Sequence, residues 1–291
     1  MNQCKHMSQF LSFLIICLAT AGCSALFFGP KPEWDALKVR WGINPLTSFK
    51  NQPRTIDDAK SEGYTATDGD ACKSDGAYRG VRYIMNDDPA LMLLFDRNGF
   101  IAGIQSALPK DKSLNFPTPQ LKFKGMLHEE SNKYTETFYF THPDKICSEG
   151  RTQAEFDRDG TGRSLFLQSG PNPSTDLIQI PNSQADMDKT KWTQTKCFYT
   201  MGMHYWYNLT ADMNCDNILP AFAIYNKGRL NAFGFAFGTY VESSRYEHPP
   251  QRVFERFLKP VPQCLYEQAT RNGGLTTMHV FLSSWPLLNR C

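Results

Sequence analysis

The sequence lacks several motifs that would identify whole classes of protein. It contains no G-x-x-x-x-G-K-[ST] or G-x-G-x-x-G phosphate loop, no G-x-S-x-G nucleophile motif and no H-E-x-x-H metal pair. No run of basic residues reaches five, and the net charge is only +2 with both signs interspersed. Nucleic acid and anionic membranes are therefore not favoured as partners. Enzymes that need none of these motifs, such as metal-assisted oxidases, stay open.

Beyond residue 28 the chain also lacks an apolar segment long enough to cross a membrane. Residues 10–28 contain no charge and follow Lys5 and His6. With the small residues of "GCSA" they predict a secretory signal peptide over residues 1–25. Two alternatives stay open: an uncleaved anchor, since the run is near the minimum for a bilayer span, and a lipoprotein cleavage box ending at Cys23.

The chain does contain an even set of cysteines after this segment, and an even set in a secreted chain predicts three disulfides. The six are Cys72, Cys147, Cys197, Cys215, Cys264 and Cys291. Asn208-Leu209-Thr210 is the one N-x-[ST] sequon without a central proline. It predicts a glycan at Asn208 on an exposed edge. Together these features predict a secreted, extracellular glycoprotein with no membrane contact once the signal is removed.

The most informative feature is an internal repeat. "WGINPLTSFKNQPRTIDDAKSEGYT" (41–65) aligns without gaps on "SGPNPSTDLIQIPNSQADMDKTKWT" (169–193). Further anchors follow in the same order: "GVRYIMN" (80–86) with "GMHYWYN" (202–208), residues 89–103 with 220–234, and "LFLQSGP" (165–171) with "VFLSSWP" (280–286). Matches in one order predict a tandem duplication of a unit of about 125 residues.

Local patterns predict the elements of one unit. Thr55 as N-cap, early acids and Gly63 predict a short helix. Asn98-Gly99 between two apolar runs predicts a β-hairpin, with a second one turning at 226–228. "FDRDGTG" (156–162) predicts a turn before a strand, since its glycine spacing does not fit an EF-hand. Residues 250–259 predict a helix whose apolar face carries Val253, Phe254, Phe257 and Leu258.

These elements predict an α+β fold with antiparallel strands, short helices and a globular composition, 41% hydrophobic and 21% charged. We expect a first repeat at residues 26–168 and a second at 169–291, related by a pseudo-twofold axis and stabilised by disulfides. The symmetric pairing 72–147, 197–264 and 215–291 is one expectation for the cysteines. A symmetric pattern that links the two copies is the alternative.

Residues that differ between the copies are the candidates for a functional site. His204 stands where the first copy has Arg82, and His279 is also specific to the second copy; each follows a methionine, Met203 or Met278. Imidazole and thioether are ligands that copper uses, so His204, His279 and Met203 form a candidate copper site. The alternative is a structural role, in which both residues are strand histidines that form hydrogen bonds within the fold.

Aromatic clusters suggest a second kind of site. In "AFGFAF" the alternation places Phe233, Phe235 and Phe237 on one face of a strand. That face is either the buried core or the wall of an apolar pocket, to which Tyr205, Trp206 and His248 would also contribute. Two functions follow. The first is a secreted protein that binds a small apolar molecule or an extracellular protein in this pocket or between the repeats. The alternative is an extracellular oxidoreductase, with copper as candidate metal, acting on a small organic substrate.

Overall fold

The computed structural model describes residues 31–42, 44 and 46–291, and its compact unit spans Glu33–Cys291. The predicted signal peptide at 1–25 lies outside the described residues. Within the described part of the chain, no helix combines the length and apolar character needed to cross a bilayer.

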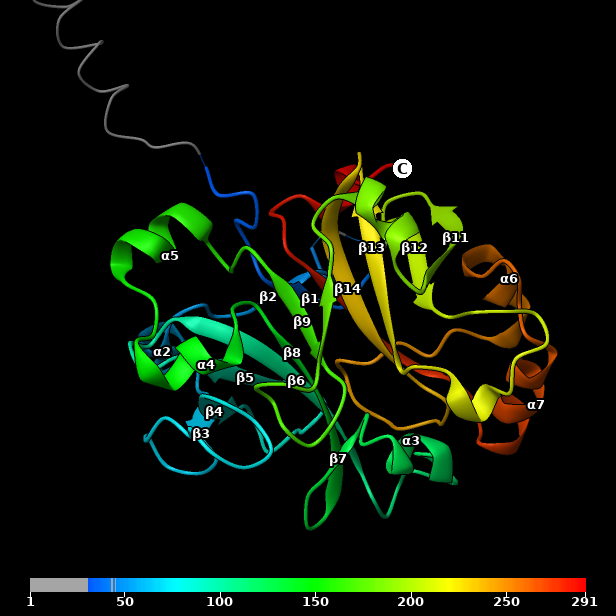
Figure 1. Cartoon of the computed structure of the whole chain (residues 1–291), viewed down its shortest axis with the longest axis horizontal. Helices are drawn as coiled ribbons and strands as arrows, with labels where there is room; N and C mark the ends of the chain where they lie inside the picture. The colour runs from blue at the N-terminus through cyan, green and yellow to red at the C-terminus, as the bar shows by residue number, and fades with distance from the viewer. Residues whose placement is uncertain (1–30, 43, 45) are drawn as a thin grey trace, which may run out of the picture. The chain divides into compact units, whose positions relative to one another are not determined.

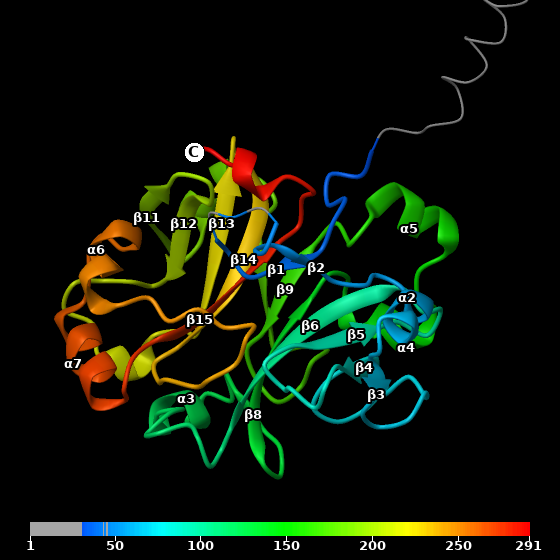
Figure 2. The ribbon, with the colours of Figure 1, turned by 180° about the vertical axis from the view of Figure 1, so that it is seen from behind.

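Two antiparallel sheets dominate the unit, which confirms the expectation of antiparallel strands with few helices (Figures 1 and 2). The eight-stranded sheet contains β3 (Thr65–Ala66), β4 (Val81–Ile84), β5 (Met92–Phe95), β6 (Ile101–Pro109), β7 (His128–Glu129), β8 (Lys133–Tyr139), β9 (Leu165–Gln168) and β10 (Leu177–Ile180). The seven-stranded sheet contains β1 (Lys38–Val39), β2 (Lys50–Asn51), β11 (Trp192–Phe198), β12 (Gly202–Tyr207), β13 (Ala221–Asn226), β14 (Arg229–Phe237) and β15 (Thr276–Phe281).

The helices are short. They are α2 (Ile56–Ser61), α3 (Pro119–Phe123), α4 (Pro143–Ser148), α5 (Gln153–Asp159), α6 (Phe254–Phe257) and α7 (Gln263–Arg271), with 3₁₀ turns η1 (Gln184–Lys189), η2 (Cys215–Asn217), η3 (Gln251–Val253) and η4 (Pro286–Leu288). The Thr55 side chain caps α2 as predicted, by accepting from the Asp58 amide. The predicted helix at 250–259 forms only as η3 and α6. The turn predicted at 156–162 is wrong in its first half, because residues 153–159 form α5 and only Gly160 ends it.

The two sheets have the same strand order. The order β3-β4-β5-β6-β8-β9-β10 in one corresponds to β11-β12-β13-β14-β15-β1-β2 in the other. Isolated bridges Thr55–Phe100 and Ser183–Arg229 occupy matching places at the start of β6 and β14. The sheet order therefore places β15 at the position of β8, and β9 at the position of β1.

One expected correspondence is wrong as a result. Residues 165–171 do not occupy the place of residues 280–286, because β9 matches β1 and not β15. The alignment joined them because both are short apolar strands followed by serine. The hairpins also cross over: β1–β2 closes the sheet built from residues 192–281, and β9–β10 closes the sheet built from residues 65–139.

The inner faces of the sheets form one apolar core. Phe138 of β8 packs on Phe233 and Phe235 of β14, with ring centroids 4.4 and 5.2 Å apart. Side chains alternate along a strand, so the row Phe233, Phe235 and Phe237 that the sequence indicated points into this core, where all three are fully buried.

Three disulfides join the six cysteines of the described residues, but only Cys72–Cys147 follows the expected pattern. The other bonds are Cys197–Cys291 and Cys215–Cys264. The pairings 197–264 and 215–291 are wrong, and the pattern that links the copies is not formed either. Cys215 lies in η2 beside α7, which carries Cys264, whereas Cys197 on edge strand β11 is within reach of the chain end. Geometry, which spacing does not reveal, thus decides the pairing.

Candidate functional site

The outer face of the seven-stranded sheet contains a cavity of about 720 Å³. Figures 1 and 2 show α6 and α7 on the side of this sheet that faces away from the eight-stranded sheet. The cavity lies between these helices and strands β12, β13, β14 and β15, and its lining is mainly aromatic and aliphatic. Its volume falls in the range of small-molecule sites, which is about 300–1,000 Å³.

Alternation along β12 decides which predicted residues reach the cavity. His204 and Trp206 point outward and line it, whereas Met203 and Tyr205 pack against the core between the sheets. The hydroxyl of Tyr205 donates to Gln194 at 2.8 Å on that inner side. The structure therefore separates Met203 and Tyr205 from His204 by the thickness of the sheet.

The roof of the cavity comes from the segment after β14. Val253, Phe254, Phe257 and Leu258, the apolar face predicted for residues 250–259, all line it. Phe257 meets the His204 ring edge-on at 5.8 Å between centroids. The Cys215–Cys264 disulfide ties η2 to α7 next to this roof, so a covalent bond holds the two covering segments together.

His204 is 2% exposed, and backbone groups of both Gly202 and Lys196 lie close to its ring. Its Nδ1 lies 3.2 Å from the carbonyl oxygen of Gly202. A carbonyl oxygen can only accept, so Nδ1 carries the proton. Burial, together with the nearby His279, lowers the pKa of His204 to about 3, and the ring is neutral at physiological pH. The other nitrogen, Nε2, is buried without a hydrogen-bond partner among the residues that the structure describes.

His279 lies beside His204, with ring centroids 6.2 Å apart. Its Nδ1 is 2.6 Å from a carboxylate oxygen of Glu247. The other oxygen of Glu247 accepts the backbone N–H of Trp41, a residue that follows β1. Glu247 thus joins the loop before η3, strand β15 and the N-terminal hairpin at the edge of the cavity.

Two more polar groups of the lining have an unpaired end. Trp206 is 8% exposed and Gln268 of α7 is 4% exposed. Within the described part of the chain, the Trp206 Nε1 and the Gln268 Nε2 are buried without a hydrogen-bond partner. A buried donor left unpaired costs about 1–3 kcal/mol, so such groups at the wall of a cavity indicate a polar atom in its occupant.

Of the remaining predicted residues, His248 reaches the cavity and the others lie elsewhere. Phe233, Phe235 and Phe237 are in the inter-sheet core and do not line the cavity. His248 lies on its wall, where Nε2 is 2.9 Å from the Val241 carbonyl and the ring stacks on Tyr240. Asn208 follows β12 and is exposed.

The candidate copper site brings two imidazoles close together, and the carboxylate beside them, Glu247, is bonded to Nδ1 of His279. Within residues 31–42, 44 and 46–291, no group of three or more His, Cys, Asp and Glu side chains is arranged to hold a metal ion. The thioether of Met203 is on the other face of the sheet, as described above.

At the corresponding outer position of the eight-stranded sheet lies a charged residue, Arg82, together with its ion-pair partners. Arg82 follows Gly80 by two residues on β4, as His204 follows Gly202 on β12, and both glycines have positive φ. Arg82 is 4% exposed, and its guanidinium lies 2.7 Å from Glu130 and 3.0 Å from Asp68. Partial burial opposes ionisation of Asp68, but hydrogen bonds from Tyr78 and Thr67 and the charge of Arg82 lower its pKa to about 2.

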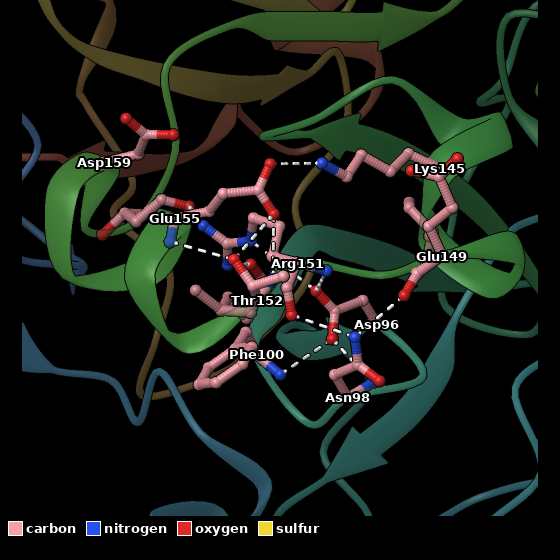
Figure 3. A network of polar contacts seen from close by, with 12 residues as sticks. Asp96, Asn98, Phe100, Lys145, Glu149, Arg151, Thr152, Glu155 and Asp159 are labelled. Atoms are coloured by element: carbon pink, nitrogen blue, oxygen red, sulfur yellow. Dashed lines mark hydrogen bonds and ion pairs between the residues drawn. The ribbon is translucent and has the colours of Figure 1, made fainter.

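A second polar network holds the β5–β6 turn, and Figure 3 shows it. The buried carboxylate of Asp96 accepts the backbone N–H groups of Asn98, Phe100 and Arg151, at 2.9–3.0 Å. Two of these bonds lie within the turn and the third joins it to the segment after α4, so this network is a structural one. The hydrogen bonds explain why the turn "FDRNG" contains Asp96, and this explanation needs no bound cation.

Sequence reasoning missed three groups at the cavity: Glu247, Trp41 and Gln268. None of them is part of a site motif in the sequence, and each reaches the site from a different segment. For Glu247 the sequence offered one signal, the adjacent His248, and the prediction named that histidine instead of the glutamate. Comparison with family models, curated proteins and solved structures gave no match for this chain.

Proposed function

We propose that this protein binds a small apolar molecule in the cavity on the outer face of the seven-stranded sheet. The observation that carries the proposal is a cavity of about 720 Å³ with an apolar lining and unpaired polar atoms on its wall. Known ligand pockets combine these two features. An extracellular protein, the other partner considered from the sequence, would need a broad surface, whereas this site lies beneath α6 and α7.

The expected affinity follows from the size of the ligand. Each buried methylene contributes about 0.8 kcal/mol, so a ten-carbon chain gains up to about 8 kcal/mol before the losses of association. A dissociation constant of 1 μM corresponds to about 8.2 kcal/mol. We therefore expect micromolar or weaker binding for simple chains, and tighter binding for a ligand that also satisfies the polar atoms.

Titration with the neutral fluorophore N-phenyl-1-naphthylamine tests the proposal. Ala236 lines the cavity from β14, so Ala236→Leu should fill part of it and weaken binding about tenfold or more. Phe235→Leu is the matched control, because the neighbouring residue on the same strand faces the inter-sheet core. It should lower stability and leave the affinity unchanged.

Two results would contradict the proposal. One is a folded wild-type protein that does not bind the fluorophore. The other is binding that Phe235→Leu weakens and Ala236→Leu does not, which would place the site among the core phenylalanines.

We also propose that the protein is secreted and carries a glycan at Asn208. Three disulfides support an oxidising compartment, and the exposed side chain of Asn208 is accessible for modification. Mass spectrometry of protein from the medium of expressing eukaryotic cells should find an N-terminus after residue 25 or close to it. Asn208→Gln should remove one glycan mass, and a chain retained in cells with its first 25 residues would contradict secretion.

Tandem duplication followed by hairpin exchange is our proposal for the origin of the fold. The matching strand orders and the matching bridges at Phe100 and Arg229 support it. Gly80 and Gly202 offer a test, since an added Cβ would lie 2.8 and 2.4 Å from the carbonyl oxygens of Phe95 and Tyr225. Alanine at either position should destabilise the fold similarly, and far more than Gly63→Ala, which meets nothing. Tolerance at only one of the two sites would contradict their equivalence.

The second candidate function is an extracellular oxidoreductase with copper at His204 and His279. One observation favours it: the two rings approach within 6.2 Å, and both use Nδ1 for their contacts with the protein. Elemental analysis of protein purified without chelators tests it. Stoichiometric copper that is lost in His204→Ala would support this function, and a metal-free protein that binds the fluorophore would exclude it.

A further inference from the structure

The polar atoms on the cavity wall restrict the chemistry of a ligand. His204 carries its proton on Nδ1, which donates to the Gly202 carbonyl, so the buried Nε2 has a lone pair and needs a donor. A ligand that meets His204 must therefore present an O–H or N–H group. A carboxylate or an ether oxygen would leave this nitrogen unpaired.

Trp206 has the complementary requirement. It lies two residues beyond His204 on the same face of β12, and its Nε1–H is buried without an acceptor. An indole nitrogen can only donate. The wall thus offers one acceptor and one donor from adjacent outward positions of a single strand, and a hydroxyl group is the simplest ligand group that can meet either one.

The charges around the cavity disfavour an anionic head at this depth. Its two arginines, Arg40 and Arg256, are exposed, whereas the charged side chain bonded to His279 is the acidic Glu247. His204 itself is neutral for the reason given above. A carboxylate bound at the depth of His204 would lose its hydration and would lie near the acidic Glu247.

We propose that the ligand is an uncharged apolar alcohol, whose hydroxyl donates to Nε2 of His204 and is within reach of the Trp206 indole N–H. This inference rests on the proposed function, because it names the chemical class of the ligand in the same cavity. His204 and Trp206 are the specificity-determining residues, and the aromatic roof contacts the apolar body.

The test is displacement of N-phenyl-1-naphthylamine from the full-length mature protein by three probes with the same chain. These are 1-decanol, its methyl ether 1-methoxydecane, and decanoate at pH 7. The ether keeps an acceptor oxygen and loses the donor, so it isolates the contact with His204. We expect 1-decanol to compete about fivefold to tenfold more strongly than the ether, as one hydrogen bond of about 1 kcal/mol requires. Decanoate should be the weakest competitor.

Two variants separate the contacts. His204→Phe keeps an aromatic ring but removes the acceptor, so it should abolish the preference for alcohol over ether. Trp206→Phe should weaken alcohol and ether by a similar factor and preserve the preference between them. Near-ultraviolet circular dichroism of both variants detects any loss of folding, and the wild-type comparison of alcohol with ether does not depend on either variant.

The outcomes distinguish this inference from the proposed function. Equal competition by alcohol and ether in the wild type, as expected if water satisfies His204, would overturn the alcohol and leave the apolar site intact. Stronger competition by decanoate would also overturn it. Failure of the fluorophore and all three probes to bind would overturn both proposals.

Discussion

The two sheets carry the same strand order, yet their outer faces at the same place are opposite in character. On β4 the residue two beyond a positive-φ glycine is Arg82, which gathers Glu130, Asp68 and Gln105 into a dense polar network. On β12 it is His204, which makes one bond with its own strand and leaves its other nitrogen at a cavity. The outer face is therefore filled by side chains at Arg82 and open to a cavity at His204. The open face is where a ligand can bind.

The covering elements explain why the filling differs. On the eight-stranded sheet, the Cys72–Cys147 disulfide ties α4 to the segment before β4. On the seven-stranded sheet, α6 and α7 form a roof that Cys215–Cys264 ties to η2. The Cys72–Cys147 disulfide packs against a buried cluster that contains Tyr78 and Tyr139. In the second disulfide, Cys215 lines the cavity.

Removing either of these two disulfides should cause the largest loss in the free energy of unfolding. By the chain-entropy model, Cys72→Ser/Cys147→Ser and Cys215→Ser/Cys264→Ser should each lower the free energy of unfolding by about 4 kcal/mol. Only the second pair should weaken binding of the fluorophore, because Cys215 lines the cavity. Urea unfolding and fluorescence titration measure the two quantities. Equal effects on binding would contradict the separation of the two faces.

Breaking the charge network comes next. Arg82→Met leaves Glu130 without its main partner in a largely buried place, and we expect a loss of about 3 kcal/mol in the free energy of unfolding. Lys189→Met is the control, since its ion pair with Asp186 is exposed and should contribute less than about 1 kcal/mol. If both variants lose the same small amount, the network is not what fills this face.

A buried acid in the eight-stranded sheet predicts a stability that falls as pH rises. Glu136 is 1% exposed on the inner face, both its carboxyl oxygens lack a partner among the described residues, and burial raises its pKa well above the usual value. The folded state therefore keeps the proton that the unfolded state releases above about pH 4.3, so stability is lost above that pH. Met278 occupies the matching place opposite Phe235.

Glu136→Met should accordingly raise the free energy of unfolding at pH 7 by about 1–3 kcal/mol. Glu136→Gln should flatten the pH dependence, because it removes the titrating group and keeps the size. Thermal unfolding between pH 4 and 8 measures both. An unchanged slope in Glu136→Gln would assign the pH dependence to another group.

The smallest expected effect has the opposite sign and belongs to the seven-stranded sheet. The pKa of His204 falls from its ordinary value near 6.5 to about 3 on folding, so its contribution is present above pH 6.5 and is lost as pH falls toward 3. Between pH 6.5 and 5 the wild type should lose about 1–2 kcal/mol that His204→Phe does not lose. Identical slopes for the two proteins would mean that His204 is accessible to solvent.

The sequence predicted the elements better than their arrangement. Asn98-Gly99 and residues 226–228 specified two hairpins through turn chemistry, and Thr55 specified the start of α2. Such signals are local, so one sequence is sufficient to read them. That β1–β2 closes the sheet built from residues 192–281 depends on contacts far apart in the chain, and no local pattern carries that information.

The candidate site shows the same limit. Alternation correctly indicates that His204 and Trp206 share a face of β12, and that Phe233 and Phe235 share a face of β14. It does not say which face is the core, because that depends on what covers each side. The second sheet covers one side, and α6 and α7 cover the other, which is why the phenylalanine row became core and the neighbouring Ala236 became cavity wall.

Anomalous scattering from crystals of the mature protein soaked with 10-bromo-1-decanol tests the central claim most directly. The account predicts a bromine peak inside the cavity, with the hydroxyl oxygen within hydrogen-bond distance of His204 Nε2. A bromine peak among the phenylalanines between the sheets, or no peak at a concentration that displaces the fluorophore, would contradict it.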